Sequence, residues 1–367
     1  MTVRRVLLGF LLVIVGLFAY KYTRTNAEQR GYRGLAMFQL KRPFQVDAQK
    51  AINAFPKPLR PGNPNGPKAS EVYQNVQVLG DLTQGQMVRL MLSIKAWVAP
   101  DVGCDYCHAA PDYASDAKYT KRVAREMLRM VRHINSDWTQ HVGATGVTCY
   151  TCHRGQPVPA KEWFAAMPRE QHGLMPPLRP GRPVTPSAAS GTVPTNLKGD
   201  YLPTPAAAST TLPNVSLGDY LQHDKAIRIV GTEALQAGNR HSINQAKETY
   251  SLMMVMSESL GVNCTFCHNT KSFFSWDLSP PQRATAWYGI RMVRDLNNGY
   301  IQTVGGLLPA NRLGPGGDNP KVYCATCHRG SNKPLGGAPM LKFYPELVRP
   351  AGGPATAQGL PASIPAG

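Results

Sequence analysis

The chain has 367 residues, with 34 glycines, 32 prolines and 8 cysteines, and a formal net charge of +18. Residues 1–70 hold 12 Lys and Arg against 2 Asp and Glu, so more than half of the charge excess lies in this first part of the chain. A basic charge placed in this way argues against a nucleic-acid-binding fold, and the abundant glycine and proline predict long irregular connections.

Residues 1–22 are predicted to form a membrane anchor. Residues 6–20 are apolar throughout and follow Arg4 and Arg5. A helix of that length spans about 22 Å, but one from Val3 to Tyr22 reaches about 30 Å, which is the thickness of a hydrocarbon core. A cleaved signal peptide is the alternative. Because no small-residue cleavage site follows directly, we expect a retained transmembrane helix.

Residues 23–70 are predicted to form a basic, extended strap. Prolines and glycines interrupt residues 43–70, and no helical period is present there. We expect the cations of this strap to lie against anionic lipid headgroups or a membrane partner, while a solvated linker is the alternative.

Residues 71–160 contain two helical patterns, each followed by a cysteine motif. Apolar residues recur at helical spacing from Leu82 to Trp97 and again from Lys118 to Ile134. The motifs that follow are Cys104-Asp-Tyr-Cys107-His108 and Cys149-Tyr-Thr-Cys152-His153.

Residues 241–345 repeat this order after a Pro/Ala-rich connecting segment, residues 161–240. A helical pattern over residues 246–260 leads to Cys264-Thr-Phe-Cys267-His268, and one opened by Pro280 and Pro281 leads to Cys324-Ala-Thr-Cys327-His328. Both second motifs continue with Arg-Gly. This repetition predicts two duplicated halves, and residues 346–367 are expected to be an irregular tail.

All eight cysteines lie in these four C-x-x-C-H motifs. The pattern is typical of a c-type haem, which takes thioether bonds from both cysteines and an axial bond from the histidine. A zinc site also uses paired cysteines, but it would not require a histidine directly after each pair. The sequence therefore predicts four covalently attached haem c groups in a mainly α multihaem cytochrome.

The second axial ligand of each iron is less strictly indicated. Met91, Met127 and Met253 each lie on a helix that leads into the next motif, while Met at helical spacing is also ordinary core filling. Close competitors are Met87, Met130, Met254 and Met256. The fourth motif has no equally near methionine, so His141 or His133 from the first half is the candidate there.

Longer motifs resemble a known family, the tetrahaem cytochrome subunit bound to purple-bacterial photosynthetic reaction centres. The resemblance runs from about Val72 to Pro345 and does not cover residues 1–65. It rests on Tyr73-Gln-Asn-Val-Gln-Val-Leu-Gly-Asp81, Arg89-Leu-Met-Leu92, His141-Val-Gly-Ala-Thr-Gly-Val-Thr-Cys149, Leu252-Met-Met254 and Asn311-Arg-Leu-Gly-Pro315. This chain departs from many members because it has no cysteine for lipidation after its N-terminal segment.

The resemblance implies an electron carrier, not an enzyme. It assigns Met91, Met127 and Met253 to the first three irons, His141 to the fourth, and Arg283 to the haem nearest the special pair. It implies haems in the order first, second, fourth, third. It also implies the reaction-centre L and M subunits as partners at the periplasmic face of the bacterial inner membrane, with a light-harvesting antenna as a further candidate.

The donor implied by the resemblance is a soluble cytochrome c or a high-potential iron-sulfur protein. We hypothesise that Asp101, Asp105, Asp112 and Asp116, which follow one another without a Lys or Arg, steer a basic donor to the first haem. The alternative function is a membrane-anchored tetrahaem quinol-oxidising cytochrome that feeds periplasmic reductases.

Overall fold

A computed structural model describes residues 3–30, 37–165, 215–229, 243–269 and 271–350. Most of the predicted connecting segment, at residues 166–214 and 230–240, lies outside the described residues, as do residues 351–367 of the predicted tail. His172 and His241 lie outside them as well.

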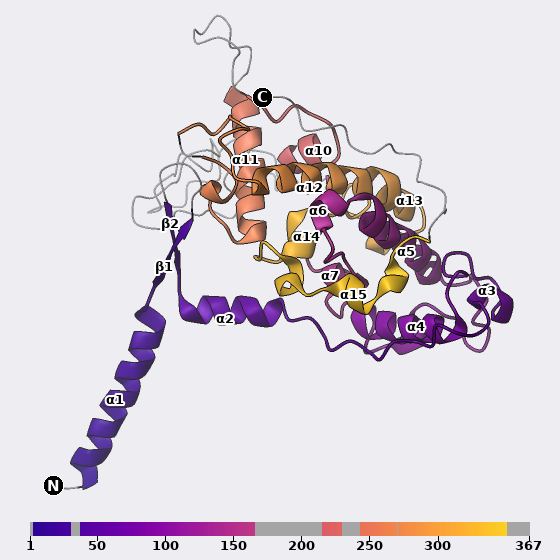
Figure 1. The fold of residues 1–367 in the computed structure, drawn as a ribbon, viewed down its shortest axis with the longest axis horizontal. Helices are drawn as coiled ribbons and strands as arrows, with labels where there is room; N and C mark the ends of the chain where they lie inside the picture. The colour runs from indigo at the N-terminus through magenta and orange to yellow at the C-terminus, as the bar shows by residue number, and fades with distance from the viewer. Residues whose placement is uncertain (1–2, 31–36, 166–214, 230–242, 270, 351–367) are drawn as a thin grey trace, which may run out of the picture.

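The described chain is mainly helical, as predicted (Figure 1). Its first part consists of α1 (Val3–Thr23), β1 (Asn26–Arg30), β2 (Met37–Lys41), α2 (Pro43–Ile52), α3 (Ala69–Val72), α4 (Gln84–Val98), η1 (Gly103–Tyr106), α5 (Tyr119–Asp137), α6 (Thr139–Val142) and α7 (Cys149–His153). The second part consists of α10 (Val215–Leu221), α11 (Ile243–Leu260), η3 (Cys264–Phe266), α12 (Gln282–Leu296), η4 (Asn297–Ile301), α13 (Gln302–Gly305), η5 (Ala310–Arg312), α14 (Cys324–His328), η6 (Pro334–Gly337), α15 (Met340–Phe343) and η7 (Pro345–Leu347).

Four long helices lead into the cysteine motifs, and their ends follow from the sequence. Helix α4 begins with a capping box, in which the Thr83 hydroxyl accepts from the Gln86 amide and the Gln86 side chain accepts from the Thr83 amide. It ends before Pro100, because a residue before proline disfavours helical geometry. Helices α5, α11 and α12 cover the other three predicted periodic segments.

The core is formed where these helices meet. Helix α4 packs on α7, α11 packs on α14, and α10 packs on both α11 and α12. The residues at the centre of this contact are apolar and buried: Leu90, Trp97, Leu128, Val131, Ile134, Tyr220, Leu221, Leu252, Ile290, Val293 and Leu296. Helix α10 belongs to the predicted connecting segment, so part of that segment lies in the core.

Residues 3–30 and 37–52 form an arm that extends from this body (Figure 1). Strands β1 and β2 pair as an antiparallel hairpin, with Asn26 opposite Lys41 and Arg30 opposite Met37. The strap was expected to contain no helix, but residues 43–52 form helix α2. Pro43 at its first position fixes a helical φ, and its missing N–H would have no partner within the helix in any case.

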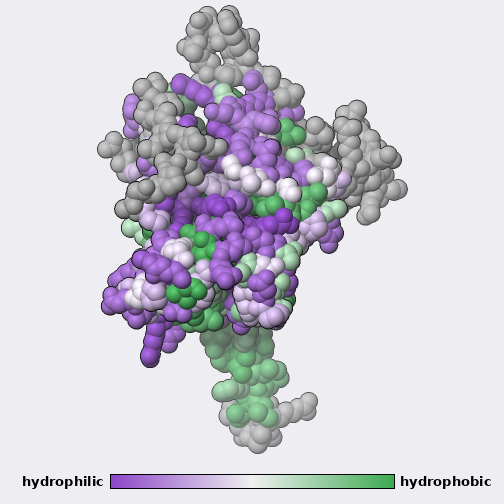
Figure 2. All heavy atoms as spheres, turned by 90° about the vertical axis from the view of Figure 1, so that its right-hand side faces the viewer, coloured by the Kyte–Doolittle hydropathy of each residue, from purple (hydrophilic) through white to green (hydrophobic). Residues whose placement is uncertain are grey.

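Helix α1 corresponds to the predicted transmembrane segment. Its apolar side chains from Val6 to Tyr20 are exposed, and Figure 2 shows them as a hydrophobic column below a largely hydrophilic body. Among the residues that the structure describes, no helix combines the length and the apolarity that a membrane crossing requires.

The first residues of the predicted C-terminal tail, residues 346–367, pack against the body. Glu346 and Leu347 are buried, and the Glu346 carboxylate accepts from the Arg89 guanidinium at 3.0 Å. Arg89 also donates to the carbonyl oxygens of Leu59 and Phe343 and lies over the Tyr344 ring. Arg89 therefore links three parts of the chain: the segment at Leu59, helix α4 and the end of the described chain.

Candidate haem sites

Five histidines share one geometry, in which Nδ1 is hydrogen-bonded to a backbone carbonyl oxygen. His108 bonds to Tyr113 at 3.2 Å, His268 to Phe273 at 2.8 Å, His153 to Gln156 at 2.9 Å, His328 to Ser331 at 2.9 Å and His141 to Thr285 at 2.9 Å. A histidine that ligates a metal through Nε2 characteristically donates its other N–H in this way. The set consists of the four motif histidines and His141.

His141 and His328 lie opposite one another across a gap. Their ring centroids are 6.0 Å apart, with the ring planes at 68°. Since a metal–imidazole bond is about 2 Å long, this spacing leaves room for one metal between a nitrogen of each ring. The structure thus brings the first half's His141 to the fourth motif.

Gly289 of α12 makes room for the His141 ring. A Cβ atom at this position would lie 2.5 Å from the Cε1 atom and 2.8 Å from the Nδ1 atom of His141. Such a contact is too short for any other residue type without displacing the ring. Sequence reasoning did not identify Gly289, because only its position against His141 reveals its role.

Burial favours the neutral, metal-binding form of four of these imidazoles. Burial lowers the pKa of His141, His153 and His268 below the usual value. Burial, together with the nearby His141, lowers the pKa of His328 to about 4. A neutral imidazole keeps the lone pair that an iron requires.

His133, the competing candidate for the fourth site, is fully occupied by carboxylates. Its Nδ1 lies 2.5 Å from an Asp137 oxygen and its Nε2 lies 2.6 Å from an Asp295 oxygen. Neither nitrogen is directed at a motif, so of the two candidates the geometry favours His141.

One cavity of about 1000 Å³ connects three of the four motifs. It is lined mostly by apolar side chains, and the lining includes all the cysteines and histidines of the first, second and fourth motifs, together with His141, Met91 and Met127. Met87, Met130 and Met256 line it too, so the cavity does not single out the methionine ligands. Phe266 of the third motif lines the cavity, but Cys264, Cys267, His268 and Met253 do not; Met253 packs against the core from α11.

The second and fourth motifs face each other. The Sγ atoms of Cys152 and Cys327 are 2.8 Å apart. The guanidinium of Arg154 donates to the Cys327 carbonyl at 3.1 Å, and that of Arg329 donates to the Cys152 carbonyl at 3.4 Å. Each arginine therefore holds the backbone of the other motif.

Both Arg-Gly pairs end their motif helices in the same way. Arg154 and Arg329 adopt left-handed backbone conformations, with φ values of 53° and 49°. The amide of Gly155 then donates to the Trp97 carbonyl of α4, and that of Gly330 to the Ser259 carbonyl of α11. Each second motif is thus tied to the helix that precedes the first motif of its half.

Arg283, which the resemblance assigns to the haem nearest the special pair, lies beside the third motif. It donates to the Ser275 carbonyl at 2.7 Å and to the Phe274 carbonyl at 3.3 Å, and its guanidinium lies 4.1 Å from the centre of the Trp276 ring. Burial lowers the pKa of Arg283.

Two of the four predicted steering aspartates are used inside the fold. Asp112 accepts from the Ala114 and Ser115 amides, and Asp116 pairs with Arg125 at 2.8 Å. The hydrogen bond from Arg125, together with its charge, lowers the pKa of Asp116 to about 2. The acidic run is therefore neutralised in part by cations from α5, which weakens the steering hypothesis.

Taken by their chemistry, these groups fit a c-type haem. Each motif offers two thiols and an imidazole whose second nitrogen is already anchored, and three motifs open into a shared apolar cavity of the size that small-molecule cofactors occupy.

Comparison with known proteins places the chain among relatives of one kind. A model of the family "Photosynthetic reaction centre cytochrome C subunit" matches residues 21–348. The match begins at residue 21, well before Val72, so the part of the arm from residue 21 onward belongs to the shared sequence, although the resemblance was expected to leave out residues 1–65.

Individual relatives agree with the family model. A photosynthetic reaction center cytochrome c subunit of Rubrivivax gelatinosus is 44% identical over 338 residues, which cover 92% of this chain and 87% of the relative. That of Thermochromatium tepidum is 45% identical, with coverage of 93% and 79%. A cytochrome c-554 of Chloroflexus aurantiacus is 28% identical, with coverage of 71% and 69%.

Proposed function

Because the chain belongs to the family of photosynthetic reaction centre cytochrome c subunits, we propose that it carries electrons from a soluble periplasmic donor to the photo-oxidised bacteriochlorophyll special pair held by the L and M subunits. The family match over residues 21–348 is the observation that carries this proposal. The anchored histidines and the apolar cavity support it, since they suit electron transfer and not bond chemistry on a substrate. We propose an electron carrier and not an enzyme.

The carrier uses four haems, each of which supplies a one-electron couple when bound. The chain holds them through Cys104, Cys107, Cys149, Cys152, Cys264, Cys267, Cys324 and Cys327. The proposed axial pairs are His108 with Met91, His153 with Met127, His268 with Met253, and His328 with His141. Methionine raises the potential relative to histidine, so the fourth site is the low-potential member of the set.

The proposed order of the haems along the path of the electron is first, second, fourth, third. The contact between the Cys152 and Cys327 sulfurs supports the central step, because the two motifs are adjacent there. The protein's work is to hold neighbouring sites at short distance and to set their potentials.

Two duplicated halves explain why the sites form two similar pairs. Asn135 of α5 exchanges two hydrogen bonds with the backbone of Val147, just before the second motif. Asn297, at the end of α12, does the same with Val322 before the fourth motif. Matching contacts at matching places support a repeat of one ancestral unit, with the proposed halves at residues 71–160 and 241–345.

Helix α1 is proposed to hold the chain at the periplasmic face of the photosynthetic membrane. Its exposed apolar side chains are suited to lipid or to an apolar membrane subunit, and the basic residues that follow suit anionic headgroups. Deleting residues 1–22 should release the protein from alkaline-washed membranes. If the truncated and full chains remained bound equally, α1 would not be the anchor.

Flash excitation of membranes that contain the complex tests the function directly. We expect a flash to oxidise a haem of this chain as the special pair is re-reduced, seen as bleaching of the reduced α-band. A chain whose haems stay reduced after the flash, but become reduced by added quinol, would instead be the quinol-oxidising cytochrome.

A further inference from the structure

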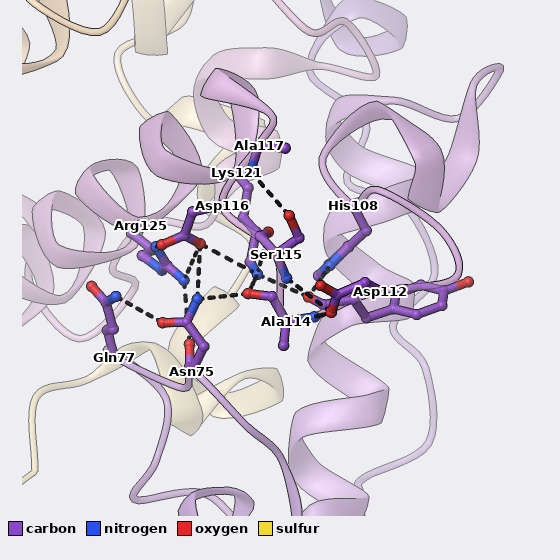
Figure 3. Close-up of polar contacts among 11 residues, drawn as sticks. Asn75, Gln77, His108, Asp112, Ala114, Ser115, Asp116, Ala117, Lys121 and Arg125 are labelled. Atoms are coloured by element: carbon purple, nitrogen blue, oxygen red, sulfur yellow. Dashed lines mark hydrogen bonds and ion pairs between the residues drawn. The ribbon is translucent and has the colours of Figure 1, made fainter.

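The ammonium group of Lys121 lies in a cage of backbone carbonyls behind the first motif's histidine (Figure 3). Its Nζ atom donates to the carbonyl oxygens of Tyr113, Ala114 and Ser115 at 2.8, 2.8 and 2.9 Å. Only 9% of the residue is exposed. Lys121 is thus a buried cation, and a cation is buried in this way only when its donors are satisfied.

One of these carbonyls also serves the histidine. The Tyr113 oxygen accepts from His108 Nδ1 at 3.2 Å as well as from Lys121. The cation is therefore separated from the proposed axial ligand by a single shared acceptor. A carbonyl polarised by a cation is a weaker acceptor, so it draws the His108 proton less and leaves the imidazole a poorer electron donor to a metal.

Arg283 has the corresponding position at the third motif. His268 bonds to the carbonyl five residues later, as His108 does, and Arg283 donates to the next two carbonyls, those of Phe274 and Ser275. Both cations come from the first turn of the following helix, α5 or α12. The two loops are thus built alike, with a cation of a different type in each.

We propose that Lys121 is a positioning residue that raises the reduction potential of the haem bound by Cys104, Cys107 and His108. This inference rests on the proposed function. The positive charge disfavours the oxidised iron, which carries one more positive charge than the reduced iron, and burial limits its screening by water. Asp116, 3.5 Å from Lys121 and partly exposed, opposes this effect.

Lys121→Gln is the direct test, because glutamine can still donate to the carbonyls but carries no charge. We expect the potential of one of the four haems to fall by about 59 mV in a potentiometric titration, which is a tenfold change in the reduction equilibrium. Lys121→Arg keeps the charge and should restore the potential. Asp116→Asn removes the opposing charge and should move the same potential upward.

Lys118→Gln is the matched control. Lys118 lies three residues earlier and donates to the carbonyl of Asp105, not to the one that His108 uses. An equal shift in this variant would reduce the effect to a general surface charge and overturn the proposal. Unchanged potentials in both Lys121→Gln and Asp116→Asn would overturn it as well.

Measuring haem content separates this inference from the function it rests on. Purified wild-type chain with no haem would refute the function and the inference together. Four haems with potentials that ignore Lys121 and Asp116 would refute the inference alone. If Lys121→Gln assembles poorly, the opposite shift expected from Asp116→Asn still decides the question.

Discussion

At the scale of single residues, glycine at position 289 leaves the space that the His141 ring occupies. Gly289→Ala would place a methyl group 2.5 Å from the His141 ring. We expect the ring to move, with loss of the low-spin bis-histidine signal of one haem in electron paramagnetic resonance, as in His141→Ala. Gly218→Ala, on α10 with nothing within 4 Å of the added carbon, should leave all signals unchanged.

The same residues show where sequence reasoning stops. It could name His141 and His133 as the two candidates for the fourth site, because few histidines lie outside the motifs. Without the family resemblance, the choice between them depends on Asp295, which is 162 positions from His133 and occupies its Nε2. A local sequence pattern does not reveal a partner so distant in the chain. The C-x-x-C-H spacing is local, and it was sufficient to identify four histidines.

At the scale of elements, a buried ion pair fastens α4 to the end of the described chain. The side chains of Arg89 and Glu346 are 5% and 4% exposed. Glu346→Gln would leave the guanidinium buried without its counter-charge, and we expect a loss of about 3–5 kcal/mol in the free energy of unfolding. Denaturant unfolding of the haem-loaded protein measures it. Glu126→Gln, which removes a partly exposed pair with Arg129, should cost less than about 1 kcal/mol.

The contact of His133 with Asp137 and Asp295, which links α5 to α12, should depend on pH. Burial lowers the pKa of His133, but the hydrogen bonds and charges of Asp295 and Asp137 outweigh burial and raise it above the ordinary 6.5. The stabilisation is then complete below about pH 6.5 and is lost as the pH rises through the raised value. We expect the denaturation midpoint to fall over that range, and His133→Gln to flatten the profile. An unchanged slope in the variant would show that other groups cause it.

Element prediction succeeded where periodicity was strong and failed where contact decided the structure. The apolar stripes of α4, α5, α11 and α12 could be recognised in the sequence because each faces the core along several turns. Helix α10 and the turn η7 are too short to show a period, and they are ordered by burial of Tyr220, Leu221 and Leu347 against distant helices.

At the scale of the whole molecule, folding redistributes charge that the sequence shows as a run. Asp101, Asp105, Asp112 and Asp116 are followed within residues 117–125 by four cations, and α5 brings Lys121 and Arg125 back onto Asp116. We expect the second-order rate of electron donation to change only weakly between low and moderate ionic strength. A steep decrease with salt, abolished by Asp101→Asn with Asp105→Asn, would restore steering by the acidic run.

In the proposed ligation, the position of His141 opposite His328 makes one site depend on both halves of the chain. The anchored carbonyls of the first and second sites come from residues 113 and 156, in the same half of the chain as their motifs. The fourth needs His141 from one half, Gly289 and Thr285 from α12 and Ser331 beyond its own motif. In the proposed ligation, this axial pair forms only once the two halves of the chain have docked.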